Sequence, residues 1–442
     1  MPANTRPNIV FVLSDQQRWD TLGCYGQGMP ITPNLDRMAA EGVRFRNTFT
    51  PQPVCGPARA CLQTGQYATE VGCFRNGIAL PGNARTLAHW LGEAGYEVGY
   101  IGKWHLADTG QTDPVPPEQR GGYGDHWLVS NMLEMTSHGY DGYLFDADMR
   151  RVDFKGYRVD CLTDFALEHL RGRTRDRPFF LFLSYLEPHH QNDRQCYEGP
   201  TGSRERFADF DVPGDLVGVD GDWPQQFPDY LGCCASLDAN LGRVRAELER
   251  LGLADNTLLI YTSDHGCHFR TRNSEYKRSC HEASIRVPLI AVGPGFRGGD
   301  VIDPLVSLLD LPPTILAACG VQAPPAMRGR QLQTLVNGPC DDWRGNVFIQ
   351  ISESQVGRAI RTARWKYAVS APSDDPDLGW NLAASDSYRE ECLYDLQNDL
   401  HERDNLVRDP RHVELRRQLA RTLQRHMASA GEESARILPA ET

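Results

Sequence analysis

Cys55 and Arg59 are four residues apart in a segment whose composition indicates a short helix. Pro57 stands where a helix can begin, and Gly65 stands where it would end. Cys55 would then lie at the helix N-terminus, where unpaired backbone N–H groups favour an anion. Arg59 would face the same side of the helix one turn later. This spacing indicates a nucleophile beside an anion-binding pocket.

Other chemically capable side chains follow directly after four apolar runs. These runs, at 8–14, 96–101, 178–186 and 256–262, have the composition of strands buried on both faces of a parallel sheet. The residues that follow them are Asp15 and Gln16, Lys103 and His105, His189 and His190, and Asp264 and His265. Ligands bind at the carboxyl ends of strands in open α/β sheets, so we expect these side chains to belong to a site there.

The segment from Cys55 to Arg59, continued by Leu62, Thr64 and Gly65, resembles a known signature. It is similar to the Cys-x-Pro-x-Arg motif of the formylglycine-dependent sulfatases, which belong to the alkaline-phosphatase superfamily. In that family a separate maturation enzyme oxidises the cysteine to formylglycine, an aldehyde. The resemblance implies this modification of Cys55; without it, the simple alternative is a buried or idle thiol.

The resemblance also implies a site for one divalent metal. Its ligands would be Asp15, Gln16, Asp264 and His265, from the ends of two strands. Many relatives carry two aspartates at the first pair, whereas Gln16 here supplies an amide oxygen and removes one negative charge. Mostly oxygen ligands suit calcium, which we expect by resemblance, with magnesium or manganese as alternatives.

Three cationic or basic side chains have roles that the resemblance implies. Lys103 and His105 match the family's Gly-Lys-x-His block. Lys103 would hold the formylglycine and sulfate oxygens, and His105 would assist breakdown of the sulfated intermediate. Arg59 would help to stabilise the charge of the attacking hydroxyl.

The proton donor and a second sulfate-binding lysine follow from the same comparison. His189 matches the histidine that protonates the leaving group, and His190 is the alternative. Lys277 opens a Lys-x4-Glu segment that ends in Arg-x-Pro, which is similar to the family's sulfate-binding segment. Lys277 would therefore close the anion pocket.

The function that the resemblance implies is hydrolysis of a sulfate monoester of a carbohydrate or an aryl alcohol. The first alternative is a phosphonate monoester or phosphodiester hydrolase of the same superfamily, because Asp15-Gln16 with Asp264-His265 resembles the metal set of that branch. The second alternative is a non-catalytic protein that binds sulfated ligands. Rates on sulfate esters and on phosphonate or phosphodiester substrates would separate the two enzyme hypotheses. Binding of a sulfated ligand without turnover would identify the non-catalytic protein.

The elements that must position these residues predict an α/β fold. We expect a large mixed, mainly parallel sheet flanked by helices, as in alkaline phosphatase, in a catalytic domain over residues 1–345. Short strands and a final helix predict a C-terminal α+β subdomain over 346–442, with a small antiparallel sheet. The stretches 107–156 and 207–229 lack a clean period, so we expect irregular loops there, the first of them around the mouth of the site.

Composition excludes several classes of protein. The 442 residues carry a net charge of −12, which argues against general nucleic-acid binding. No apolar run is long enough to cross a bilayer, and the first residues do not resemble a signal peptide, so we expect a cytoplasmic protein without a membrane partner. The thirteen cysteines are scattered and show no paired metal-ligand spacing, which favours free thiols without a structural zinc site. A homo-oligomer is left open.

Overall fold

The computed structural model describes residues 6–441 except 175, 374, 376 and 433–434. Its centre is an eleven-stranded sheet in the order β13-β2-β12-β10-β1-β9-β4-β5-β7-β6, with β8 paired to β7. The middle strands run parallel, and antiparallel pairs flank them. The parallel strands are β1 (Asn8–Ser14), β4 (Glu97–Lys103), β5 (His126–Ser130), β9 (Phe179–Ser184) and β10 (Thr257–Ser263).

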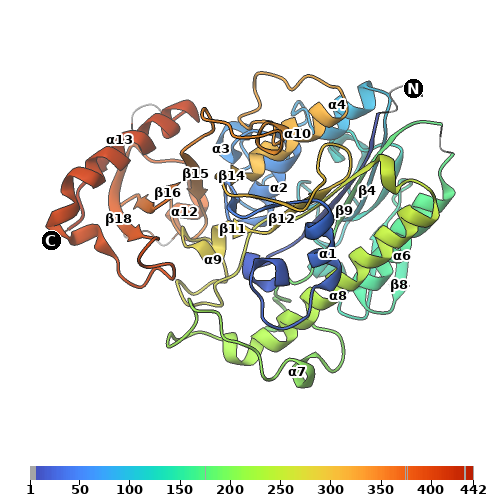
Figure 1. Cartoon of the computed structure of the whole chain (residues 1–442), viewed down its shortest axis with the longest axis horizontal. Coiled ribbons are helices and arrows are strands. Elements are labelled where there is room, and N and C mark those ends of the chain that lie inside the picture. The colour runs from blue at the N-terminus through green and yellow to red at the C-terminus, as the bar shows by residue number, and fades with distance from the viewer. Residues whose placement is uncertain (1–5, 175, 374, 376, 433–434, 442) are drawn as a thin grey trace.

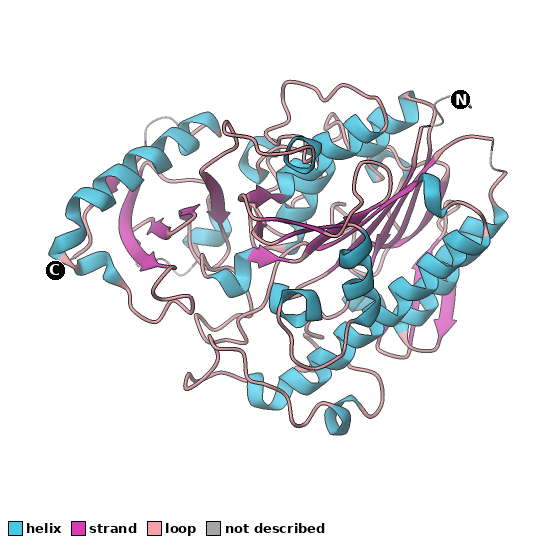
Figure 2. Ribbon diagram, viewed as in Figure 1, coloured by secondary structure: helices cyan, strands magenta, loops and turns pink. Residues whose placement is uncertain are grey.

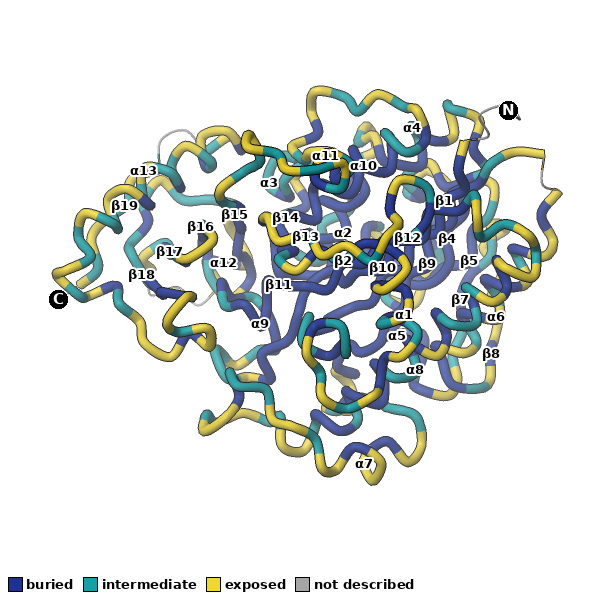
Figure 3. The backbone as a smooth tube through the Cα atoms, viewed as in Figure 1, coloured by how far each residue is buried: buried dark blue, intermediate teal, exposed yellow. Residues whose placement is uncertain are grey.

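The apolar runs form the middle of the sheet because both of its faces are covered. In β1, Ile9, Phe11 and Leu13 belong to the core on one face, and Val10 and Val12 belong to the core on the other. This alternation is the period of two that an extended chain imposes. Figure 3 shows the central strands as buried along their length.

Helices pack on both faces of the sheet and give the molecule three layers (Figure 2). The helices on one face are α2 (Cys55–Thr64), α4 (Leu87–Glu93) and α10 (Leu311–Ala318). Those on the other face are α1 (Pro33–Glu41), α6 (Arg158–Gly172) and α8 (Trp223–Arg250). The one-turn helices are α3 (Ala68–Val71), α5 (Leu133–Thr136), α7 (Ser203–Arg206), α9 (Glu282–Ile285), α11 (Gln333–Val336) and α12 (Leu378–Asn381).

The C-terminal part forms a second sheet beside the first, at the left of Figure 1. Four antiparallel strands and one parallel strand build it: β15 (Asn346–Ile351), β16 (Gly357–Thr362), β17 (Trp365–Ser370), β18 (Ser387–Asp395) and β19 (Arg436–Leu438). Helix α13 (Val413–Ser429) packs on one face. The other face shares a core with Phe49, Ile285 and Leu305 of the preceding chain. The α/β architecture expected from the sequence is confirmed.

Three local expectations were wrong. Residues 107–156 are not only loops, because they contain β5 and the antiparallel edge strands β6 (Ser137–His138), β7 (Asp141–Phe145) and β8 (Arg151–Lys155). The stretch 207–229 ends in helix, since α8 already begins at Trp223. The sequence of residues 43–49 also predicts a single strand, but the structure has two strands there, in different sheets. The first, β2 (Val43–Phe45), belongs to the large sheet and lies between β12 (Leu289–Val292) and β13 (Asp300–Ile302). The second, β3 (Thr48–Phe49), belongs to a small sheet and lies between β11 (Arg286–Val287) and β14 (Val306–Ser307).

None of the helices formed by the described residues combines the length and the apolar character needed to cross a bilayer. All thirteen cysteines carry free thiols.

Candidate active site

Cys55 is the first residue of α2, and its side chain is 1% exposed. The helix ends as its sequence predicts: Gly65 adopts the left-handed conformation, with φ of 71°, and its N–H donates to Cys61 O at 2.8 Å. Every residue of α2 is buried, so the helix holds Cys55 in a fixed place inside the protein.

Lys277 lies directly against Cys55. Its Nζ is 2.8 Å from Cys55 Sγ, although the two residues are on different elements. Burial raises the pKa of the Cys55 thiol, but the ammonium groups of Lys277 and Lys103 overcome that effect and hold this pKa well below its usual value. The pocket therefore stabilises a negative charge at position 55.

Asp15, at the carboxyl end of β1, joins two further cations to this pocket. Its Oδ2 is 2.8 Å from Lys103 Nζ and 3.0 Å from Arg59 Nη2. Burial and the neighbouring Cys55 oppose ionisation of Asp15, yet Lys103, His189 and Arg59 bring its pKa below the usual value. Burial also opposes the charge of Lys103, whose pKa nevertheless rises because Asp15 is close. The carboxylate and the two cations thus stabilise one another in the charged state.

Two carboxylates and an imidazole converge where a metal could bind. Ligand atoms of Asp15, Cys55, Asp264 and His265 lie within 4.8 Å of one another. Asp264 Oδ2 is buried and accepts no hydrogen bond from the residues that the structure describes, and its ion-pair partner is Arg59, with Nε 3.2 Å away. Burial, and next the charge of Asp15, raise the pKa of Asp264. A divalent cation would remove this repulsion, so the donor set fits a metal.

Gln16 adjoins the same group of ligands. Its backbone N–H donates to Asp264 Oδ1 at 3.1 Å. Its side-chain Nε2 donates to Tyr197 Oη at 3.0 Å and faces Cys267 Sγ at 3.5 Å. With the nitrogen engaged, the amide oxygen is the atom left for a metal.

The two adjacent histidines point to different partners. His189 Nε2 is 3.2 Å from Lys277 Nζ, which places it beside the thiol. His190 is turned away from the thiol: its Nε2 faces Tyr276 Oη at 3.0 Å and its Nδ1 faces Asn192 Oδ1 at 3.1 Å. Of the pair, His189 is the one that the structure brings to Cys55.

His105 also lies at Cys55, because a hydrogen bond from its side chain is among the causes that lower the pKa of that thiol. Strand β4 ends at Lys103, and His105 has a left-handed backbone with φ of 63° instead of continuing the strand. Gln16 and Arg278 are likewise non-glycine residues with positive φ, at 68° and 64°. Left-handed conformations of such residues are strained, and they concentrate where structure serves a site.

Three residues at the site were not expected from the sequence. Glu134 is buried, with Oε1 3.2 Å from Lys103 Nζ, and Ser184 Oγ accepts from Arg59 Nη1 at 2.7 Å. Asn76 Oδ1 accepts from the N–H of Gly56 at 2.9 Å. Ser184 ends β9, so the same strand-end rule would have found it. Glu134 follows β5, and that strand lay unrecognised in the stretch expected to be loops.

This arrangement is suited to transfer of an anionic group. A buried nucleophile position faces two lysines and an arginine, a histidine lies within reach as an acid, and a metal can bind beside it. Every site residue expected from the sequence lies in or next to this pocket except His190.

Comparison with known proteins decides the family. A sulfatase family model matches residues 7–321, and a model of the C-terminal region of N-sulphoglucosamine sulphohydrolase matches residues 274–429. The chain is 31% identical over 446 residues to the uncharacterized sulfatase YidJ of Escherichia coli, covering 93% of this chain and 85% of that protein.

Two further relatives agree with this assignment. The chain is 26% identical over 436 residues to an N-acetylglucosamine-6-O-sulfatase of Bacteroides thetaiotaomicron, covering 80% of this chain and 76% of that protein. The crystal structure of yidJ from Bacteroides fragilis superposes with a TM-score of 0.84 at 25% identity, covering 98% and 97% of the two chains. The chain therefore belongs to the sulfatase family of the alkaline-phosphatase superfamily, and it is a sulfuric ester hydrolase.

Proposed function

We propose that this sulfatase hydrolyses a sulfate monoester of a carbohydrate, with Cys55 as the formylglycine precursor. The observation that supports the proposal is the surroundings of Cys55 Sγ, with Lys277 Nζ at 2.8 Å and His265 Nε2 at 3.1 Å. These groups favour an anion at the position of attack and on the sulfate oxygens. A carbohydrate ester follows the relative that acts on N-acetylglucosamine 6-O-sulfate, and an aryl sulfate is the other substrate class to test.

The roles of the surrounding residues follow from their positions. Lys103, Lys277 and Arg59 neutralise the sulfate and the attacking oxygen. His189, next to Lys277, protonates the departing alkoxide. His105 takes the proton whose loss releases sulfate. The hydrate of formylglycine would supply two hydroxyls, one as the nucleophile and one whose deprotonation would release sulfate and leave the aldehyde, which water would then hydrate again.

The metal that fits the site is a divalent cation, and we propose calcium. Asp15, Gln16, Asp264 and His265 would hold it, and the three oxygen ligands favour a hard ion. When bound, the cation stabilises negative charge on the sulfate oxygens. Metal analysis of the purified protein distinguishes calcium from magnesium and manganese.

The first experiment is the mass of the peptide that contains Cys55, from protein produced together with a formylglycine-generating enzyme. Conversion removes the sulfur and two hydrogens and adds one oxygen. The modified protein is then assayed on sulfated sugars, an aryl sulfate and a phosphonate monoester, with Cys55→Ala as the inactive control. Sulfate esters are expected to react fastest. A preference for the phosphonate ester, or an unmodified Cys55 with full activity, would refute the proposal.

A further inference from the structure

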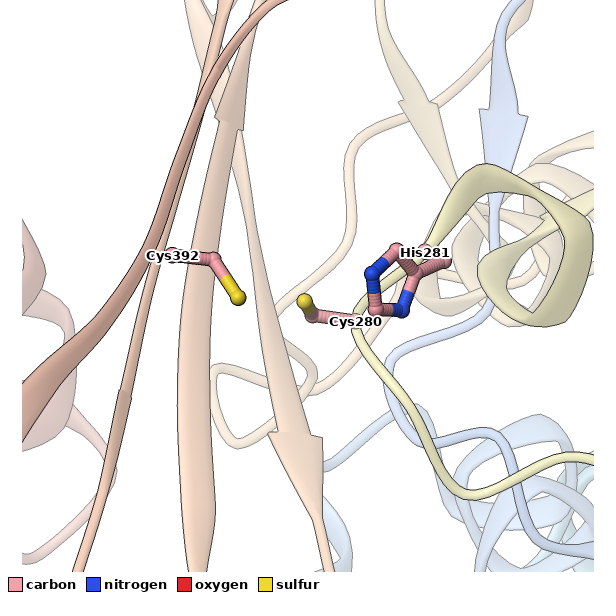
Figure 4. A group of neighbouring side chains, drawn as sticks. All are labelled: Cys280, His281 and Cys392. Atoms are coloured by element: carbon pink, nitrogen blue, oxygen red, sulfur yellow. The ribbon is translucent and has the colours of Figure 1, made fainter. Parts of the chain in front are cut away.

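A second group of metal-ligating side chains lies outside the active site. Ligand atoms of Cys280, His281 and Cys392 all lie within 4.8 Å of one another. Cys280 and His281 belong to the segment between Lys277 and α9, whereas Cys392 lies on β18 of the C-terminal sheet. Figure 4 shows the Cys392 sulfur directed across the gap at Cys280, with the His281 ring beside it.

Both sulfurs of the cluster are buried, His281 is half-buried, and a further oxygen lies beside them. Cys280 is 3% exposed and Cys392 is 7% exposed. The hydroxyl of Tyr394 lies 3.2 Å from His281 Nε2, and Tyr394 shares a face of β18 with Cys392 because the two are separated by one residue. Two sulfurs, one imidazole nitrogen and one hydroxyl therefore meet at a single buried place, where zinc commonly has four ligands.

Two cations, Lys366 and Arg272, lie near the cluster. Lys366 is buried and held by Glu282 at 2.8 Å and Glu402 at 2.6 Å, so two carboxylates neutralise its charge. Arg272 donates to the backbone oxygens of His401 and Glu402. Hydrogen bonding to Cys392, and next burial, raise the pKa of Cys280 and keep this thiol protonated when no cation is bound.

We propose that Cys280, Cys392 and His281 bind a thiophilic divalent metal ion of the zinc class. On binding, the two S–H groups release their protons, and two sulfur–metal bonds and one nitrogen–metal bond form, so a dication replaces two protons without any redox step. The Tyr394 hydroxyl stands beside the fourth position. The structure records these thiols as free, which distinguishes the group from a disulfide.

Such an ion would join two parts of the molecule close to the active site. Cys280 is three residues after Lys277, whose Nζ contacts Cys55. The metal would fasten the Lys277 segment to β18 and so restrain the chain that carries the lysine. This inference does not depend on the proposed carbohydrate substrate.

The test is cobalt and zinc binding to the reduced full-length protein under anaerobic conditions. A Cys55→Ser background is used, because Cys55 is the thiol of the active-site metal group and would give its own signal. Cobalt bound by thiolates shows a sulfur-to-metal charge-transfer band that an oxygen site lacks. We expect one equivalent of cobalt with this band, displaced by zinc.

Variants assign the band to particular residues. Cys280→Ser and Cys392→Ser should each abolish the two-thiolate spectrum, and His281→Gln should keep the band but weaken binding at least ~10-fold, since even outer residues of metal sites cost that much. Cys161→Ser, a half-buried thiol on α6, is the matched control and should change nothing. No band in the reduced protein, or a band that survives both cluster substitutions, overturns the proposal. A Cys280–Cys392 disulfide in protein isolated without reductant, with no cobalt uptake after reduction, also overturns it.

Discussion

At the scale of single residues, His189 and His190 provide a direct test of the proton donor. Only His189 faces Lys277 and the nucleophile, whereas His190 is engaged by Tyr276 and Asn192. We expect His189→Ala to lower kcat by about 100- to 10,000-fold on a sugar sulfate, because loss of a general acid has this effect. The loss should be much smaller on an aryl sulfate with an acidic phenol, which departs without protonation.

The control for this prediction is His190→Ala. It should lower kcat by a similar factor on both substrates, since its effect is on packing around Tyr276. Measurement of kcat for both variants on both esters decides the assignment. A leaving-group-dependent loss in His190→Ala, absent from His189→Ala, would exchange the two roles.

Part of the candidate site follows from local sequence. The strand ends at Asp15 and Asp264 predict that these groups lie at one edge of the sheet, and the structure brings both together with Cys55. Glu134 was not predicted, because only its contact with Lys103 identifies it as part of the site, and the two residues are distant in sequence. The Cys280–Cys392 pair was missed for the same reason.

At the scale of elements, the C-terminal end of α2 is stabilised by Gly65. An added Cβ would lie 2.7 Å from Met327 Cγ, and φ of 71° is costly for any residue with a side chain. We expect Gly65→Ala to lower the free energy of unfolding by about 1–2 kcal/mol. Denaturant unfolding of the purified variant measures this change.

Gly92, in α4, is the matched control for Gly65→Ala. It has open space where a Cβ would point and an ordinary backbone conformation. Gly92→Ala should therefore leave stability unchanged or raise it by up to about 1 kcal/mol, because alanine favours helix. Equal losses in the two variants would contradict the role assigned to the left-handed end of α2.

The sequence predicted the buried strands better than the exposed strands at the edge of the sheet. The β1 strand has the bounds expected, 8–14, because a continuous apolar run between two helical layers has few alternatives. The edge strands β7 and β8 were not found. Three of the five residues of β8 are exposed, and its alternation offers only two apolar side chains, Val152 and Phe154, which is too short a pattern to stand out. Their pairing comes from the neighbouring strand and not from their own composition.

At the scale of the whole molecule, we propose that the boundary at residues 345 and 346 separates two regions that unfold together. Strand β15 begins at Asn346, and its sheet shares a core with Phe49, Ile285 and Leu305. Buried Glu282 also pairs with Lys366 at 2.8 Å across the boundary. Removal of 346–442 would expose this core and leave Glu282 without that partner. Loss of one partner of a buried ion pair lowers the free energy of unfolding by about 3–5 kcal/mol.

The expected result is a single cooperative transition of the full chain in calorimetry, and an insoluble product from a chain that ends at residue 345. Two separate transitions, or a soluble fragment 6–345 with native far-ultraviolet dichroism, would show that the two regions fold independently. Sequence composition predicts the boundary, but it does not predict the shared core, since that core is made of residues from both sides.

The burial of α2 limits when another enzyme could modify Cys55. All ten residues from Cys55 to Thr64 are enclosed, so no second enzyme can reach the thiol once the chain has folded. The proposed conversion of Cys55 to formylglycine would therefore have to precede folding, and a molecule that folded first would stay inactive. Presenting the maturation enzyme with native and with unfolded protein tests this order: only the unfolded chain should be converted, and conversion of the native form would refute it. The yield of active enzyme would then depend on the rate of Cys55 conversion relative to the rate of folding during synthesis.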